Sequence, residues 1–296
     1  MIIIRLKGGL GNQLFQYAAS RALAQRHGAL LRLDTTWYDG ETPPGPDRRT
    51  FDLRAFRISA PCASHAELAR FGGAGATSRR SGRGRRLLQA FMGHRVWRND
   101  DLGFVPELGR LGSSVYLEGY FQHPAHFAGI EEVLRSECVL VRPMEGEALC
   151  FGRRLAEETS VCIQVRRTDF VHDEAKARVH NVCGPDYHRK AWDRLREEVP
   201  GAKGYVFTDD NVWARNHFDG WGDVEVVPPE MDGPGFMHRF ELMRACRHFI
   251  IMNSTWGWWA AWLGAKAGSR VVMPEQWVRD RTTRELGFVC RGWETA

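Results

Sequence analysis

Three apolar runs in the second half of the chain each end in a cluster of charged or hydroxylated residues. Arginine suits a diphosphate, because its planar guanidinium stays charged and donates two parallel hydrogen bonds. Hydroxyl groups at a helix start add donors where the helix dipole favours an anion, and a carboxylate accepts the N1–H and amino group of guanine. The clusters are Arg166, Arg167 and Asp169; Thr208, Asp209 and Asp210; and Asn253, Ser254 and Thr255.

The runs before these clusters have the composition of buried strands, and helical segments lie between several of the strands. Alternating strands and helices predict a doubly wound parallel sheet, which binds ligands at the carboxyl ends of its strands. The second half therefore predicts a nucleoside diphosphate site at one edge of an α/β sheet. The expected strands are 161–167, 204–210, 224–228, 248–255 and 270–274, and the expected helices are 186–198, 211–219 and 238–247.

Each cluster also has a purely structural interpretation. The Arg-Arg-x-Asp sequence at 166–169 suits an ion-pair corner, and Asp210 is better explained as the N-cap of the helix that follows. The apolar stretch "WGWWAAWL" after the third cluster is typical of core packing. The joint occurrence of all three clusters is what favours a binding site.

The first half opens with "KGGLGNQLFQYAAS" at residues 7–20. A strand at 2–6, a helix over 14–27 with Gly28 as its C-terminal cap, and a strand at 29–34 form one β-loop-α-β unit. The loop is not a dinucleotide fingerprint, because Leu14 stands where the last glycine of that motif belongs. It is not a phosphate-binding Walker loop either, because no Gly-Lys-Ser/Thr follows.

Length and composition indicate the class of protein. The chain has 296 residues, of which 43% are hydrophobic, enough for two domains; we place them at 1–145 and 146–296. A net charge of +5 is too weak to indicate a nucleic-acid partner without a focused patch. Seven cysteines without a CxxC pair, and no apolar run long enough to span a membrane, predict a reduced, cytoplasmic protein. No Asp-x-Asp occurs, so we expect no metal.

Residues 70–98 break the pattern. They contain eight arginines and no acidic residue. We favour a solvated loop that leads into a short helix. The alternative is a basic surface that contacts an anionic membrane or a lipid-linked acceptor, which would make the protein peripheral at the inner face of the membrane.

Several motifs resemble one known family in order along nearly the whole chain. "GGLGNQLFQYA" (8–18), "VYLEGYFQHPAHF" (115–127), "QVRRTDF" (164–170), "YVFTDDNVW" (205–213) and "LMRACRHFIIMNSTWGWWAAWL" (242–263) are similar to segments of the α-1,2-fucosyltransferases, glycosyltransferase family 11. The resemblance implies a GT-B-like fold with two Rossmann-like domains facing a cleft. It also implies inverting, metal-independent transfer of L-fucose from GDP-β-L-fucose to the 2-hydroxyl of a terminal galactose, or a similar hexose, of an oligosaccharide or lipid-linked glycan.

The resemblance also implies roles for single residues. Arg166 matches the arginine that grips the β-phosphate, Arg167 its neighbour, and Asp209 the carboxylate that binds guanine. Ser254 and Thr255 match phosphate-binding hydroxyls on the second, donor-binding domain. The sequence departs from the family at Gln164, where histidine is usual, and at Gly257, where serine is usual. We expect Gln164 to reach the ribose or the guanine edge.

The first domain is expected to bind the acceptor. Gly9 and Gly11 would let the first loop face the cleft, and Asn12 and Gln13 would hydrogen-bond the acceptor sugar, the fucosyl group or the pyrophosphate; both could instead only cap the first helix. Asp169, Glu118 and His123 are candidates for the general base, and we favour Asp169. Two rivals stay open: a transferase of the same fold with another acceptor or sugar nucleotide, and a non-catalytic sugar-nucleotide-binding protein.

Overall fold

The chain folds into two compact units, Met1–Val141 and Arg142–Ala296. The computed structural model describes residues 1–40, 48–71, 95–184 and 186–296, without the side chains of Asp169, His172 and Lys176. The division between the units falls four residues before the boundary expected at residue 145. Most of the basic segment 70–98 lies outside the described residues.

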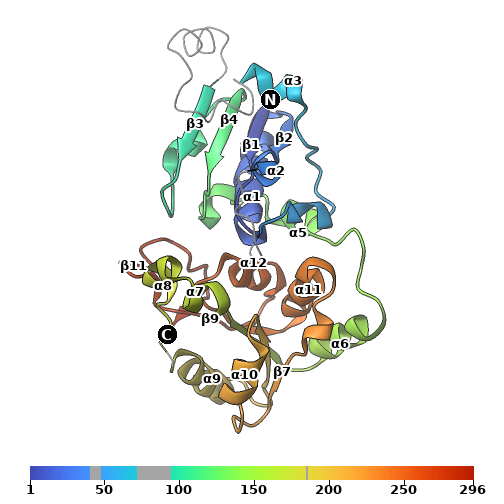
Figure 1. Ribbon diagram of the computed structural model, residues 1–296, viewed down its shortest axis with the longest axis vertical. Helices are drawn as coiled ribbons and strands as arrows, with labels where there is room; N and C mark the ends of the chain where they lie inside the picture. The colour runs from blue at the N-terminus through green and yellow to red at the C-terminus, as the bar shows by residue number, and fades with distance from the viewer. Residues whose placement is uncertain (41–47, 72–94, 185) are drawn as a thin grey trace. The chain divides into compact units, whose positions relative to one another are not determined.

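The first unit is built on a four-stranded parallel sheet with the strand order β2-β1-β4-β3 (Figure 1). β1 has the sequence IIIR and is buried along its whole length, as is typical of a central parallel strand. The elements of the first unit are β1 Ile2–Arg5, α1 Leu10–His27, β2 Leu31–Asp34, α2 Trp37–Gly40, η1 Asp52–Ala55, α3 His65–Arg70, β3 Arg95–Asn99, η2 Pro106–Arg110, β4 Val115–Gly119, η3 Pro124–Phe127 and α5 Glu131–Glu137.

Helix α1 begins earlier than the sequence pattern predicts and ends where it predicts. Gly9 is the N-cap, and its carbonyl accepts hydrogen bonds from the backbone N–H groups of Asn12 and Gln13. Gly28 closes the helix in the left-handed conformation, at φ 57°. Gly8 carries the positive φ of the loop, 81°, so among the loop glycines this is the one whose backbone requires glycine.

The second unit is built on a six-stranded parallel sheet with the order β12-β9-β8-β5-β6-β7. All six residues of β5 are buried, and helices and turns connect the strands as predicted. The elements of the second unit are α6 Gly146–Glu157, β5 Ser160–Val165, α7 Thr168–His172, α8 Glu174–His180, α9 Tyr187–Glu198, β6 Lys203–Thr208, α10 Asn211–His217, β7 Val224–Val226, η4 Pro229–Met231, η5 Pro234–Phe236, α11 Met237–Ala245, β8 His248–Ile250, α12 Thr255–Gly264, β9 Val271–Met273, β10 Gln276–Val278, β11 Arg281–Thr282 and β12 Glu294–Thr295.

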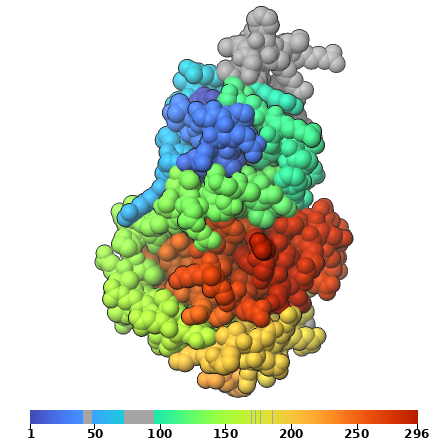
Figure 2. Space-filling model, turned by 180° about the vertical axis from the view of Figure 1, so that it is seen from behind, coloured from blue at the N-terminus to red at the C-terminus, as the bar shows by residue number. Residues whose placement is uncertain are grey.

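β8 is shorter than the predicted strand at 248–255. It ends at Ile250, because the backbone N–H of Met252 donates to the side chain of Gln164 instead of continuing the sheet ladder. The chain then turns sharply into α12. In the space-filling view, the residues after about 250 are orange to red and the residues near 200 are yellow (Figure 2). Within the described residues, no helix is long and apolar enough to cross a membrane.

Candidate active site

The three polar clusters share one edge of the second sheet. β8, β5 and β6 are neighbouring parallel strands, so their carboxyl ends lie side by side. Arg166 follows β5, Asp209 follows β6, and Ser254 stands at the end of the turn after β8. The parallel arrangement that the sequence predicts is therefore confirmed, and it places these side chains where doubly wound sheets bind ligands.

Asp209 holds the turn that follows β5. Its Oδ1 accepts a hydrogen bond from the backbone N of Arg167 at 2.8 Å, and its Oδ2 accepts from the backbone N and the hydroxyl of Thr168 at 3.3 and 2.7 Å. These bonds fix the first residues of α7 to the neighbouring strand. A carboxylate has about four acceptor positions, so a contact from Asp209 to guanine would add to this structural role.

Arg167 is fixed by an acid and an aromatic ring. Its Nε lies 3.4 Å from Asp210 Oδ2, and its guanidinium lies 4.0 Å from the centre of the Trp213 ring. Asp210 also caps α10 by accepting from the backbone N of Trp213 at 3.1 Å, which confirms the predicted N-cap. His217 stacks on Trp213 at 4.2 Å, and burial, followed by the charge of Arg167, lowers the pKa of His217.

Arg166 belongs to the same turn and is half-buried. Its backbone N donates to the Met252 sulfur at 3.0 Å, which links the end of β5 to the turn after β8. Its guanidinium lies over the Phe170 ring at 4.8 Å. An aromatic ring attracts a cation without adding an opposite charge of its own.

Ser254 differs from the other polar residues of this edge. It is the N-cap of α12 but makes no side-chain capping bond. The residue is 3% exposed, and its hydroxyl is buried without a hydrogen-bond partner among the described residues. An unpaired buried hydroxyl is costly and calls for an explanation, such as a ligand. Thr255 is the first residue of α12, so this hydroxyl lies at a helix N-terminus, which favours the binding of an anion.

Two other polar residues of this edge are structural. The Asn253 amide donates to the carbonyls of His180 and Trp277, both at 2.9 Å, so it anchors the turn to its neighbours. Gln164 is 5% exposed, and its Oε1 accepts from the backbone N of Met252 at 3.0 Å. The fold therefore uses the side-chain carbonyl of Gln164, and contact of its amide nitrogen with the ribose or guanine stays a prediction.

The first loop of the other unit also differs from its predicted role. Gln13 is fully buried; its Nε2 donates to the carbonyls of Gly8 and Thr50, and its Oε1 accepts from the backbone N of Asp52 and Leu53. A side-chain amide has no further capacity, so Gln13 is a structural residue and not a ligand contact. Asn12 is half-buried, and its Oδ1 accepts from Gln122 Nε2 at 2.7 Å.

The candidate bases lie in different surroundings. Glu118 is paired with Arg5 at 2.9 Å and with Arg98 at 2.7 Å, so arginines engage both of its carboxylate oxygens. His123 uses its Nδ1 to accept from the backbone N of Ala125, and burial lowers its pKa. Asp169 lies in α7, but its side chain is outside the described part of the chain.

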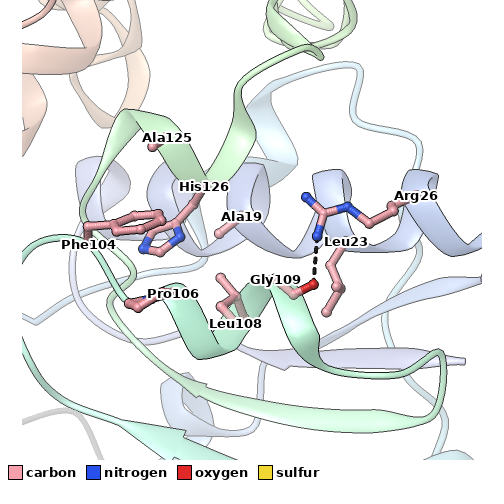
Figure 3. Close-up of a pocket in the computed structure, with 9 residues that line it drawn as sticks. All are labelled: Ala19, Leu23, Arg26, Phe104, Pro106, Leu108, Gly109, Ala125 and His126. Carbon is pink, nitrogen blue, oxygen red and sulfur yellow. Dashed lines mark hydrogen bonds between the residues drawn. The ribbon is translucent and has the colours of Figure 1, made fainter.

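A pocket in the first unit lies along the second half of α1 (Figure 3). Phe104 and His126 stack at 5.1 Å at one end, and Arg26 donates to the carbonyl of Gly109 at 2.8 Å at the other. Burial lowers the pKa of His126 to about 4, so its imidazole is neutral at pH 7. The pocket contains none of the predicted site residues, although Ala125 and His126 belong to the family segment 115–127.

Three contributors to the site were missed by the sequence reasoning: Met252, Trp213 and Phe170. Each contacts an arginine residue of the β5 turn through a weak acceptor or an aromatic ring. All three lie within the family segments 164–170, 205–213 and 242–263, but nothing in the sequence separates them from their neighbours there. Among the residues that the structure describes, no group of three His, Cys, Asp or Glu side chains could hold a metal ion.

Comparison with solved structures agrees with this architecture. An Arabidopsis thaliana FUT1 mutant in complex with GDP superposes with a TM-score of 0.52 and 14% identity, over 92% of this chain and 70% of that chain. Two units with parallel sheets and this likeness define a GT-B-like α/β glycosyltransferase fold, as predicted. Similarity at this level of identity shows the fold alone.

Sequence comparison then shows the family. The model of glycosyl transferase family 11 matches residues 92–294, more than half of the chain. The chain belongs to this family, which confirms the predicted resemblance. It is 28% identical to the Escherichia coli O-antigen biosynthesis glycosyltransferase WbnK, over 95% of this chain and 96% of that protein. It is 24% identical to an Escherichia coli alpha-1,2-colitosyltransferase, over 94% and 92%. It is 27% identical to the Mus musculus galactoside 2-alpha-L-fucosyltransferase Sec1, over 89% of this chain and 64% of that longer protein.

Proposed function

We propose that this protein is an inverting, metal-independent fucosyltransferase. It would transfer L-fucose from GDP-β-L-fucose to the 2-hydroxyl of a terminal galactose, or a similar hexose, of an oligosaccharide or lipid-linked glycan. Family membership and the names of the relatives support this activity. The observation that carries the donor assignment is the unpaired, buried hydroxyl of Ser254 at the N-terminus of α12, on the same sheet edge as Arg166.

The chemistry follows from the charge that develops on the leaving group. When the bond between fucose and the β-phosphate breaks, GDP gains negative charge, and fixed donors stabilise that charge without reorganising. In this proposal Arg166 supplies the guanidinium, and Ser254, Thr255 and the first N–H groups of α12 supply neutral donors. Arg167 adds positive charge from a fixed position. These groups would do the work for which other glycosyltransferases use a divalent cation.

The acceptor hydroxyl must lose its proton to a base within hydrogen-bond reach. We assign the acceptor to the first unit, with Gly9, Gly11 and Asn12 in its loop. Asp169 and His123 are the proposed bases. His123 is the weaker of the two, because its Nδ1 already accepts from the backbone N of Ala125 and the neutral ring then carries its proton on Nε2. Glu118 is set aside because two arginines neutralise it.

One assay tests the whole assignment. The purified protein is incubated with GDP-fucose and lactose in excess EDTA, GDP release is followed, and the linkage of the product is read by NMR. We expect an α-1,2-linked fucose and no requirement for metal. Activity that collapses in EDTA and returns with Mg²⁺ or Mn²⁺ would contradict the role of Arg166, and GDP-fucose that is bound but never hydrolysed or transferred would indicate a non-catalytic binding protein.

Colitose is the second donor sugar to test, because one relative is an alpha-1,2-colitosyltransferase. The same reaction is run with a colitose donor, and with GDP-mannose and UDP-galactose as controls. A preference for the colitose donor would change the sugar but keep the nucleotide site. A preference for UDP-galactose would overturn the assignment to a GDP-linked donor.

A further inference from the structure

Gln164 connects two strand ends through the backbone of the turn after β8. Its Oε1 accepts from Met252 N at 3.0 Å, and the Met252 sulfur accepts from Arg166 N at the same distance. The Met252 carbonyl in turn accepts from the backbone N of Ser254 at 2.7 Å. A continuous set of hydrogen bonds therefore runs from β5 through Met252 to the N-cap of α12.

The space around the Gln164 amide depends on Gly257, which lies in the first turn of α12. A Cβ atom at position 257 would lie 2.6 Å from Gln164 Oε1 and 3.0 Å from its Cδ. Real Cβ atoms essentially never approach a neighbour as closely as the first of these distances. Gly257 lies within a helix, so any L-residue could adopt its backbone conformation. A side chain at position 257 would therefore displace the end of the Gln164 side chain, which the hydrogen bond from Met252 N holds in place.

We propose that Gln164 is a positioning residue and that Gly257 leaves the space that its amide occupies. The buried amide sets where Ser254 and the first turn of α12 lie relative to Arg166, so that both engage the diphosphate of the nucleotide. This inference rests on the proposed function, because it takes GDP as the ligand of this edge. It replaces direct contact between Gln164 and the donor with an effect transmitted through Met252.

The steric coupling gives a double-mutant test. Gly257→Ala places a methyl group against Gln164 Oε1 and should weaken GDP binding at least tenfold, measured by calorimetric titration. In a Gln164→Ala background the methyl group has room, and the same change should cost less than threefold. Equal losses in the two backgrounds would overturn the proposed coupling.

Two further measurements separate positioning from general damage to the fold. Gln164→Met keeps the length of the side chain but removes the acceptor, so it should weaken GDP more than GMP, which lacks the β-phosphate. Gly204→Ala is the matched control: a Cβ there would lie 2.9 Å from Ile163 Cδ1, at the amino end of β6 and away from the site edge. It should lower the melting temperature without changing the ratio of GDP to GMP affinity.

The outcomes distinguish this inference from the proposed function. If the wild-type protein binds no GDP, the donor assignment fails. If the wild type binds GDP and the folded Gln164→Met and Gly257→Ala variants bind it equally well, only the positioning role is wrong. A Gly204→Ala variant that loses GDP as strongly as Gly257→Ala would reduce the effect to stability.

Discussion

The carboxyl edges of the two sheets carry similar kinds of residue but use them differently. In the first unit, Gln13 makes four hydrogen bonds to backbone groups and has no capacity left. In the second unit, the Ser254 hydroxyl is just as buried but has no partner among the described residues. A polar residue after a strand therefore indicates a ligand only when its hydrogen-bonding groups are left unused by the fold.

The largest effect is expected from Arg166→Ala. The variant should lose at least a hundredfold in kcat/KM, because a charge-assisted hydrogen bond contributes about 1.5–3 kcal/mol and contributes more where charge grows in the transition state. The melting temperature should change little, since Arg166 is half-buried and its guanidinium lies against the Phe170 ring. Steady-state kinetics with GDP-fucose and a melting curve measure both.

A suitable control for Arg166→Ala is Arg154→Ala, which removes an exposed arginine paired with Glu225 in the same unit. It should leave kcat/KM within a factor of two. If Arg166→Ala retained most of the wild-type activity, the carboxyl edge of the second unit's sheet would not be the donor site. The contrast between the edges of the two sheets would then be lost.

Gln13→Ala should show the opposite behaviour. Removing the amide leaves buried N–H and carbonyl groups of the first loop unpaired, so we expect the free energy of unfolding to fall by about 2–4 kcal/mol. GDP affinity should be unchanged, because the second unit carries the proposed donor site. Denaturant unfolding and titration of GDP into the folded variant test this pair of expectations. A variant with full stability but a raised KM for the acceptor would restore Gln13 as a ligand contact.

Buried histidines offer a comparison between the units that depends on pH. Burial lowers the pKa of His126 in the first unit and of His188 in the second to about 4. The unfolded value is about 6.5, so the folded state favours the neutral form in both cases. The stability that this provides is complete above pH 6.5 and is lost as the pH falls toward 4, by up to about 1.4 kcal/mol per pH unit for each histidine.

Melting temperatures measured between pH 4 and 7 test this for each unit. His126→Gln should flatten the pH dependence of the first unit's stability, and His188→Gln should flatten that of the second, where the imidazole lies 3.1 Å from the carbonyl of Gln164. A wild-type slope that both variants keep would assign the pH dependence to carboxylates instead.

Much of the architecture could be predicted because it depends on sequence patterns a few residues long. The all-apolar β1, the left-handed Gly28 after α1 and the polar residues that end β5 and β6 each act over a few positions. The partners of Gln13 and Gln164 could not be predicted, because they are backbone groups brought close only by the tertiary fold. The departures at Gln164 and Gly257 looked independent in the sequence, yet the two residues are neighbours.

The smallest effect, and the most direct test of the contrast between the edges, is expected from Ser254→Ala. Its hydroxyl has no partner among the residues that the structure describes, so removing it should leave the melting temperature unchanged or slightly raised. If the hydroxyl donates to the diphosphate, the variant should lose about tenfold in kcat/KM, the equivalent of one hydrogen bond to a charged group. Ser20→Ala is the matched control: Ser20 is also buried, but its hydroxyl donates to the carbonyl of Gln16 at 2.8 Å within α1, so activity should not depend on it. A Ser254→Ala variant that is destabilised and fully active would show that this hydroxyl serves the fold, as Gln13 does, and would leave the anion site to Arg166 and the helix N-terminus alone.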